Sequence, residues 1–452
     1  MTNIFDPSRY RALLIEGYDF VDGRYIGNYV LRGVDSRDDI RFMEQVDFGT
    51  SLSGSPDPRL LRLLTLTCSL SYFKSAAPPA IETGFGASNF ELAYLRELVK
   101  GGLGEFAYRN DLRAALSPQL ATAHGTRSHD AIVDAASDDW KADRSPLVPV
   151  GGGKDSVVTI ESLRSHGFHP TLFSVNRFVP IDRCIEVSGL SSIHVTRTID
   201  PKLIRANEGG AYNGHIPVTA INSVLATIVA DANDLGPVVM SNEQSSNVGN
   251  VEWFEMEINH QWSKSLAYET LLRNTLEGYG LNPGRYFSLL RGLSESEIAD
   301  RFASCFRYFD VFVSCNRPFA LDPARRHASW CGTCPKCLFV FLLLAPRLGR
   351  AQTESIFGAD LFDREANLQG FEEILGLHSH KPFECVGEYY EGAESLLTVF
   401  DQPEWCGSLI VERLRARRDE VATVAKAKQH IQSPTHYVPR VYEETLSDNV
   451  SA

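Results

Sequence analysis

The sequence predicts an α/β protein in which a central parallel sheet is flanked by helices, with an α+β N-terminal domain and a mainly helical C-terminal segment. Two observations lead to this prediction. Between about residues 145 and 347, short runs rich in β-branched residues alternate with longer runs of helical periodicity, which is typical of a parallel sheet wrapped by helices. At the start of this region, a short apolar run breaks into three consecutive glycines and then into a helical pattern.

With 452 residues, the chain is long enough for roughly two or three domains, each with its own core. We predict an α+β domain at residues 1–125, a linker or mobile loop at 126–144, a sheet-containing domain at 145–347, and a mainly helical segment at 348–452. The proposed linker is polar and poor in apolar residues. The chain ends in a tail with proline and serine, which we expect to be loosely ordered.

The periodicity of apolar residues predicts the individual elements in order along the chain. The N-terminal domain has strand patterns at 25–31 and 40–46 and helical patterns at 60–72 and 90–100. The following domain has strand patterns at 147–150, 171–175, 192–196 and 238–241, and helical patterns at 157–163, 220–232, 265–276 and 338–344.

The glycine run joins the first strand of the sheet-containing domain to the helix that follows. Glycines let the backbone turn sharply, so Gly151, Gly152 and Gly153 expose N–H groups at a helix start, where these donors and the helix dipole favour an anion. Asp155 would repel a phosphate unless a divalent cation lies between them. The turn therefore predicts a pyrophosphate site with magnesium, and the simpler alternative is a glycine-rich turn without a ligand. The phosphate loop GxxxxGK[ST] is excluded, because two of its positions do not match.

Polar residues that follow other predicted strands should lie near this turn. Ligands of open parallel sheets bind at the carboxyl ends of the strands. Asn176 comes after one strand, and Ser241, Asn242 and Glu243 come at the end of a later one. We therefore expect these side chains on the same edge as the turn, with Glu243 as a magnesium ligand or a base.

The segment 241–265 is dense in asparagine, glutamate, glutamine and serine, a composition that suits a substrate-binding loop. A solvated polar loop would have the same composition, so both interpretations stay open. Within the segment, His260 is the residue best suited to carry a proton near neutral pH, and Lys264 suits a phosphate or carboxylate. His215 precedes a predicted helix and is a second candidate proton carrier, with a structural role as the alternative.

A cluster of cysteines predicts a metal site. Cys331, Cys334 and Cys337 follow one another at intervals of three, and Cys315 lies sixteen residues upstream of the first. Four thiolates at this spacing suit a structural tetrahedral zinc site. An iron–sulfur cluster and ordinary free cysteines are the alternatives. The neighbouring basic residues that would offset part of the thiolate charge are Lys336, Arg325 and Arg326.

Composition argues against several classes of function. The net charge of −13, from 57 acidic and 44 basic residues, argues against a large nucleic-acid footprint. No run of 18 apolar residues is present, and the N-terminus lacks the pattern of a signal peptide, so we expect no membrane partner. Nine cysteines, an odd number with three tightly clustered, suit a reducing cytoplasm better than a disulfide framework. We expect a cytoplasmic enzyme.

Several motifs resemble known families. The glycine turn resembles the SGGxDS loop of the N-type ATP pyrophosphatases, the PP-loop superfamily, with Gly151 in place of the first serine. The chain as a whole resembles the MurL family of ATP-dependent epimerases, which act on UDP-N-acetyl-alpha-D-muramoyl-L-alanyl-L-glutamate in bacterial cell-wall synthesis. The motifs are Tyr-Phe-Lys at 72–74, Gly-Glu-Phe-Ala-Tyr-Arg-Asn at 104–110, Gly-Gly-Gly-Lys-Asp-Ser at 151–156, Gly-His-Ile-Pro-Val-Thr at 214–219, Ser-Asn-Glu at 241–243, Asn-His-Gln-Trp-Ser-Lys-Ser at 259–265, Ser-Cys-Asn-Arg-Pro at 314–318 and Trp-Cys-Gly-Thr-Cys-Pro-Lys-Cys at 330–337. They cover roughly residues 70–347.

The resemblance implies a PP-loop fold for 145–347 and an epimerase of peptidoglycan biosynthesis that uses ATP and magnesium. The small-molecule substrate would be the UDP-muramoyl dipeptide, whose terminal L-glutamate becomes D-glutamate through an acyl-adenylate, with release of AMP and pyrophosphate. Implied phosphate and magnesium contacts are Gly151, Gly152, Gly153, Lys154, Asp155 and Ser156, and the nucleotide site would extend to Asn176, Ser241, Asn242 and Lys264. The candidates for the catalytic acid and base are His260, His215 and Glu243.

Three alternatives belong to other classes of protein. A related pyrophosphatase that makes a nitrile or amide from a small carboxylate, as in deazapurine synthesis, would combine the same loop with a four-cysteine cluster. A tRNA-thiolating enzyme would need a catalytic cysteine and an RNA-binding surface. A non-catalytic nucleotide-binding regulator would bind ATP without releasing pyrophosphate. The sequence leaves the identity of the acid and base and the oligomeric state open.

Overall fold

The computed structural model describes residues 5–122, 145–320, 324, 326–327, 329–378, 381–427 and 435–447. The predicted linker at 126–144 and Arg325 lie outside the described residues. The chain divides into two compact units, each built from separate stretches of sequence. Unit 1 comprises Met1–Leu147, Ile193–Val238 and Glu252–Phe287, and unit 2 comprises Val148–Ser192, Val239–Val251 and Ser288–Ala452. The four-part division stated above stays a prediction.

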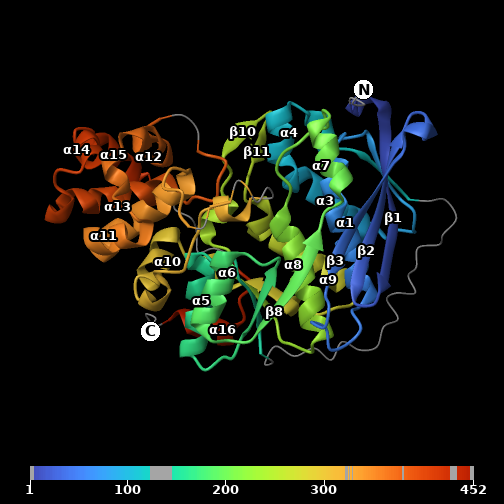
Figure 1. Ribbon diagram of the computed structural model, residues 1–452, viewed down its shortest axis with the longest axis horizontal. Helices are drawn as coiled ribbons and strands as arrows, with labels where there is room; N and C mark the ends of the chain where they lie inside the picture. Colours follow the sequence, from blue (N-terminus) through green and yellow to red (C-terminus); the bar gives the residue numbers. More distant parts are fainter. Residues whose placement is uncertain are drawn as a thin grey trace. The chain divides into compact units, whose positions relative to one another are not determined.

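The strands of unit 1 follow the order β8-β3-β2-β1-β4-β5. Figure 1 labels the first four of them, β8, β3, β2 and β1. Strands β1 (Tyr10–Val21), β2 (Arg24–Gly33) and β3 (Ile40–Asp47) form an antiparallel meander, and β8 (Ser192–Thr198) pairs antiparallel with β3. Strands β4 (Ala80–Thr83) and β5 (Gln119–Thr122) continue the order in parallel pairing. The strands predicted at 25–31 and 40–46 are confirmed. The long β1 was not predicted, because glycine and charged residues interrupt its alternation.

The helices of unit 1 begin at recognisable capping residues. The side chain of Asp57 accepts a hydrogen bond at the start of α1 (Pro58–Cys68), and Ser88 forms a capping box with Glu91 at the start of α3 (Asn89–Gly102). The predicted helix at 60–72 is divided into α1 and α2 (Leu70–Phe73). The other helices of this unit are α4 (Gly104–Asn110), α7 (Pro201–Glu208), α8 (Val218–Ala232) and α9 (Leu266–Gly278).

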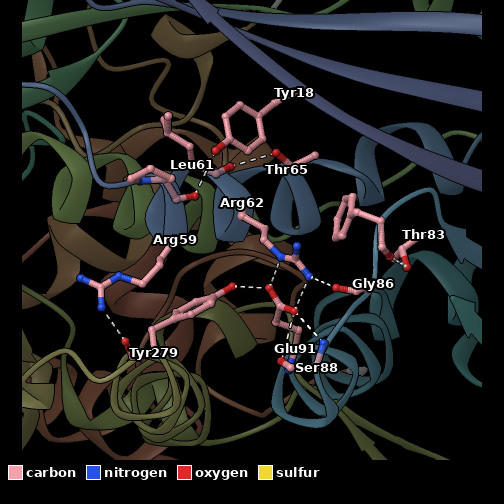
Figure 2. Close-up of polar contacts among 12 residues, drawn as sticks. Tyr18, Arg59, Leu61, Arg62, Thr65, Thr83, Gly86, Ser88, Glu91 and Tyr279 are labelled. Atoms are coloured by element: carbon pink, nitrogen blue, oxygen red, sulfur yellow. Dashed lines mark hydrogen bonds and ion pairs between the residues drawn. The ribbon is translucent and has the colours of Figure 1, made fainter. Parts of the chain in front are cut away.

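A buried ion pair connects three segments of unit 1, as Figure 2 shows. Arg62 on α1 contacts the carboxylate of Glu91 on α3 through both Nε and Nη2, and the Nη2 distance is 2.7 Å. The hydroxyl of Tyr279, just after α9, donates to the same carboxylate at 2.7 Å. The side chain of Glu91 is 2% exposed and that of Arg62 is 12% exposed. Because an unpaired buried charge is costly, this pair fixes how the three segments pack.

A second run of strands has the order β12-β9-β6-β7 and leads into the helices of unit 2. Its members are β6 (Leu147–Pro149), β7 (Thr171–Val175), β9 (Val238–Met240) and β12 (Tyr286–Ser288), and β6 pairs in parallel with β9. The helices that follow are α5 (Lys154–Ser165), α6 (Val179–Ser188) and α10 (Glu295–Phe302). The alternation of strands and helices predicted from residue 145 is present, and the α/β class is confirmed.

The described part of 348–452 is mainly helical, as predicted (Figure 1). Its helices are the end of α11 (Pro335–Phe357), then α12 (Leu368–Ile374), α13 (Tyr389–Asp401), α14 (Leu409–Arg415) and α15 (Arg418–Lys426). The expectation of a loosely ordered tail is wrong for α16 (Arg440–Glu443). Tyr442 on this helix is fully buried, and its ring centroid lies 4.8 Å from that of Phe168, so aromatic packing holds this part of the tail in place.

Candidate functional site

The glycine turn in unit 2 connects β6 to α5 and has one position that only glycine fits. Gly152 has φ +76°, and a Cβ at this position would lie 3.0 Å from the backbone of Pro180. Gly153 is the N-cap residue of α5 and supplies no capping side chain, although the backbone N–H of Lys154 donates to Ser314 Oγ at 3.4 Å. The turn therefore presents the start of a 12-residue helix through backbone groups.

Lys154 does not extend from the turn into solvent. Its side chain is fully buried, and Nζ forms ion pairs with Asp155 Oδ1 and Glu295 Oε2. Burial lowers the pKa of Lys154, but the two carboxylates outweigh this effect and raise it overall. Burial raises the pKa of Glu295 despite Lys154 and the ammonium of Lys336, 3.9 Å away. The ammonium predicted to position a triphosphate is held between two carboxylates in this structure.

Two of the polar residues that follow β9, Asn242 and Glu243, are buried. Glu243 is 1% exposed, and neither of its carboxylate oxygens has a hydrogen-bond partner among the described residues. The charge of Glu243 acts on Glu295 and helps to raise the pKa of that group. Asn242 is also buried, its N–H donating to Ser288 Oγ at 2.6 Å, whereas Ser241 is half-buried. A buried carboxylate without donors is suited to bind a cation.

Glu391 on α13 is a third buried acidic residue near Glu295, in addition to Glu243. Burial raises the pKa of Glu391 to about 7, helped by the charge of Glu295 and opposed by hydrogen bonds from the backbone of Glu388 and Ser296. Gly387 lies close to both acidic side chains, since a Cβ built at this position would lie 2.5 Å from Glu391 Oε2 and 2.8 Å from Glu295 Cγ.

The remaining predicted residue of this edge, Asn176, lies just after β7 with φ +62° and is half-buried.

Two of the three predicted acid–base residues lie side by side in unit 1. The rings of His215 and His260 have centroids 4.5 Å apart, and both face Glu105 on α4. Nδ1 of His260 lies 2.5 Å from Glu105 Oε2, and Nδ1 of His215 lies 3.8 Å from the same oxygen. Arg109, one turn further along α4, donates to Glu105 Oε1 at 2.6 Å. The carboxylate is thus shared by two imidazoles and a guanidinium.

Charge and burial set the protonation of this cluster. Burial raises the pKa of Glu105, but the hydrogen bond and charge of His260, then the charge of His215, lower it overall. Burial and the charge of His260 lower the pKa of His215 to about 4, although Glu105 opposes this. Burial lowers the pKa of Lys74 to about 8, and its Nζ donates to Asn213 Oδ1 at 2.9 Å and to the carbonyl of Gly214 at 3.0 Å. His215 is therefore neutral near pH 7 beside a buried ammonium.

Glu105, Glu295 and Glu391 were not predicted as site residues. Glu105 was noticed only within a motif, and Glu295 only becomes visible when α10 brings it to Lys154. Glu105 and Arg109 are spaced i,i+4 on one helix, the spacing of a helical ion pair, and this was the one usable signal in the sequence. No local pattern marks Glu295, because its partner is 141 residues away along the chain.

The segment 241–265 is not one polar loop. It contains a short helix, η5 (Gln244–Asn247), the hairpin strands β10 (Val251–Trp253) and β11 (Met256–Ile258), and η6 (Trp262–Lys264). Its first residues belong to unit 2 and its later residues to unit 1. In η6, Nζ of Lys264 donates to Gln261 Oε1 at 3.4 Å.

The four predicted cysteine ligands come together in unit 2. Their sulfurs all lie within 4.8 Å of one another. Sγ of Cys315 is 3.7 Å from that of Cys334, and Sγ of Cys337 is 3.6 Å from that of Cys331 and 3.5 Å from that of Cys334. The nine cysteines are all free thiols, and Cys315 and Cys337 are buried. The four cysteines that were predicted from their spacing in the sequence therefore form one cluster in the structure.

The histidine cluster of unit 1 and the glycine turn of unit 2 each indicate a class of protein. Paired imidazoles on a buried carboxylate are typical of proton-transfer sites, and a glycine turn at a helix start is typical of anion-binding sites. An α/β protein that has both the histidine cluster and the glycine turn belongs by these features to the class of enzymes. Residues 5–289 match the MurL N-terminal domain and residues 311–429 match the MurL C-terminal domain. The chain belongs to the MurL family.

Three curated relatives support this assignment, and each is named UDP-N-acetyl-alpha-D-muramoyl-L-alanyl-L-glutamate epimerase. The protein from a Micromonospora species is 40% identical over 95% of this chain and 96% of its own length. The protein from Salinispora tropica is 39% identical over 95% of this chain and 93% of its own length. The protein from Xanthomonas oryzae pv. oryzae is 39% identical over 78% of this chain and 77% of its own length. The similarity thus extends well beyond residues 70–347. No solved structure matches the chain significantly.

Among the described residues, no helix has both the length and the apolar character needed to cross a membrane.

Proposed function

We propose that this chain is an ATP- and magnesium-dependent epimerase that converts the terminal L-glutamate of UDP-N-acetylmuramoyl-L-alanyl-L-glutamate to D-glutamate for peptidoglycan synthesis. The reaction passes through an acyl-adenylate and releases AMP and pyrophosphate. The single observation that carries the proposal is the cluster of His215, His260 and Glu105 in a chain 39–40% identical to proteins named as this epimerase.

The chemistry explains why an epimerase of this kind would use ATP. The Cα–H beside a carboxylate is hard to remove, because the resulting carbanion lies next to an existing negative charge. Adenylation cancels that charge, so that a side-chain base of ordinary strength can take the proton. Reprotonation on the opposite face and hydrolysis of the adenylate then give the D-glutamyl product.

The nucleotide half of the reaction is assigned to the turn of unit 2. The backbone of Gly151, Gly152 and Gly153 suits the phosphates, and Ser156 lies in the first turn of α5. A magnesium ion would be held by Asp155, with Glu243 as the further buried carboxylate of this unit. The ion would neutralise the phosphates where two acidic residues would otherwise repel them.

The proton-transfer half is assigned to the histidine cluster. A Cα between two rings needs about 3.5 Å of van der Waals distance to each, whereas His215 and His260 are 4.5 Å apart between centroids. The two rings therefore act on one face of the substrate. His260, oriented by Glu105, is the proton carrier, and His215 is the neutral ring beside it. The opposite face needs a further proton carrier besides these two rings.

Purified protein incubated with the L-glutamyl nucleotide, ATP and magnesium tests the proposal. We expect D-glutamate after acid hydrolysis, together with AMP and pyrophosphate. Formation of neither D-glutamate nor AMP would refute it. An ammonia-dependent amide or nitrile product would favour the nitrile-forming alternative, a shift of tRNA mobility the thiolating one, and ATP binding without pyrophosphate release a regulator.

Asp155→Asn provides the sharper version of this test. AMP formation should collapse while the circular dichroism spectrum stays unchanged, because the amide is isosteric but cannot neutralise a cation. Asp310→Asn, at an exposed position of the same unit, should leave turnover unchanged. Normal turnover by Asp155→Asn would remove Asp155 from the metal site.

A further inference from the structure

The distances within the cysteine cluster are those of a mononuclear metal centre. A tetrahedral centre with zinc–sulfur bonds of about 2.3 Å has sulfur–sulfur edges of about 3.8 Å. The measured edges from Cys334 to Cys315 and Cys337 are 3.7 and 3.5 Å, and that from Cys331 to Cys337 is 3.6 Å. A disulfide would need about 2.05 Å. Thiolates that bind the separate irons of an iron–sulfur cluster lie further apart, because inorganic sulfide occupies the space between them.

The backbone around the cluster is folded as a metal knuckle. Gly332 has φ +69°, and the N–H of Cys334 points back to Cys331 Sγ at 3.4 Å, while Thr333 Oγ1 donates to the same sulfur at 3.6 Å. Asn367 secures the turn by donating to the carbonyl of Gly332 at 3.1 Å. Thiolates gathered in this way need a cation at their centre.

The residues before Cys315 contact the glycine turn. The backbone N–H of Val313 donates to the carbonyl of Gly152 at 2.8 Å. Ser314 Oγ accepts from the N–H of Lys154 at 3.4 Å. Because Cys315 follows directly, fixing its sulfur also fixes the two residues that hold the turn.

The knuckle also contacts the carboxylate that pairs with Lys154 of the glycine turn. Lys336, between Cys334 and Cys337, lies in the first turn of α11 and is 5% exposed. Its Nζ is 3.9 Å from Oε1 of Glu295, the carboxylate whose other oxygen pairs with Lys154. One metal would thus hold both the segment that contacts the turn and the lysine that contacts Glu295.

We propose that Cys315, Cys331, Cys334 and Cys337 bind one structural Zn²⁺, and that this ion positions Ser314 and Lys336 against the glycine turn. The metal assignment is independent of the reaction, whereas its coupling to the turn rests on the proposed function. The four thiolates close the coordination shell, so the ion has no open position for chemistry. Ser314 and Lys336 are positioning residues.

Metal analysis of the full-length protein, purified without chelator, tests the first half. We expect one zinc per chain by inductively coupled plasma mass spectrometry. Replacement by Co²⁺ should give the intense thiolate-to-cobalt and d–d absorption of a tetrahedral tetrathiolate site. Cys334→Ser should lose the ion, and Cys406→Ser, at an exposed cysteine, should keep it. Protein without metal, or with iron and sulfide in stoichiometric amounts, would overturn the assignment.

Calorimetric titration with ATP and magnesium tests the second half. Ser314→Ala and Lys336→Met should keep the zinc but weaken ATP binding by about five- to tenfold, the scale of one lost hydrogen bond or charge contact. Ser329→Ala, at an exposed position nearby in sequence, should change neither. Unchanged ATP affinity in both variants would refute the coupling. Zinc-loaded wild-type protein that binds no ATP would contradict the proposed function and leave the zinc assignment standing.

Discussion

Nδ1 of His260 lies 2.5 Å from Oε2 of Glu105, a carboxylate on a different segment of the chain and only 5% exposed. A carboxylate this close fixes the ring orientation and favours the tautomer with hydrogen on Nδ1. Nε2 is then the nitrogen that can exchange a proton with substrate. Glu105 is therefore a positioning residue for His260. It does not orient His215 in the same way, because Nδ1 of His215 lies 3.8 Å from the same oxygen.

Replacing Glu105 by glutamine should slow turnover more than it weakens substrate binding. The amide still fills the space, but it does not favour the charged ring that forms during proton transfer. General acid–base catalysis contributes about 10²–10⁴-fold, so His260→Ala should lose kcat on this scale, and Glu105→Gln should lose at least about tenfold. KM should change little. Steady-state kinetics with the L-glutamyl nucleotide measures both.

Glu97→Gln is the matched control, because Glu97 is exposed on α3 of the same unit. It should leave kcat and KM unchanged. Glu105→Asp should recover part of the lost kcat, since the charge returns at a slightly longer distance. Equal kcat for the wild type and Glu105→Gln would contradict the positioning role.

Lys74 should make stability depend on pH in the alkaline range. Burial lowers its pKa from 10.5 to about 8 in the folded chain, so between these values the unfolded chain binds more protons, and stability rises with pH. A shift of this size corresponds to about 3 kcal/mol. Lys74→Met, which removes the buried charge, should be more stable than the wild type at pH 7, with a difference that shrinks toward pH 10.5. Chemical denaturation at several pH values measures it.

Lys100→Met serves as the control for this pH dependence. Lys100 is exposed at the end of α3, so its substitution should leave the pH dependence of stability parallel to that of the wild type. A constant difference between Lys74→Met and the wild type from pH 7 to 10.5 would show that the lysine is not deprotonated in the folded chain within this range.

The sequence predicted elements well where the apolar pattern is local. The strand at 171–175 and the helix that ends at Ala232 agree with the structure, because their periodicity continues without interruption. The four cysteines were also predicted as a set, since three of them lie in one short turn. Such features depend on neighbours in sequence, which is why one chain suffices to find them.

The rest depended on contacts distant in sequence. Glu105 and His260 are 155 residues apart, and Lys154 and Glu295 are 141 apart, so no spacing rule connects them. The pairing of β3 with β8 likewise joins Val46 to Arg197. Periodicity says which face of an element is buried, but it does not say which element covers it.

Arg62 should be needed for the stability of unit 1. Arg62→Met leaves Glu91 as a buried carboxylate without its cation, a change that costs about 3–5 kcal/mol. Adding Glu91→Gln to this variant should recover part of the loss, because the unpaired charge disappears. Arg37→Met should stay within about 0.5 kcal/mol of the wild type, since Arg37 is 87% exposed. Urea unfolding of the wild type and the three variants measures these differences in the free energy of unfolding. A smaller loss for Arg62→Met than for Arg37→Met would contradict the prediction.

The glycine turn should tolerate alanine at one position and reject it at the next. Gly151 has ordinary φ and nothing within 4 Å of a built Cβ, so Gly151→Ala should unfold at the wild-type midpoint. Gly152→Ala must adopt a left-handed conformation, which costs about 1–2 kcal/mol, and its Cβ would meet the backbone of Pro180 at 3.0 Å. That backbone can yield only by shifting the start of α6, so the turn should distort, and both stability and ATP affinity should fall. Equal midpoints and equal ATP affinity for the two variants would mean that the turn has another conformation in solution.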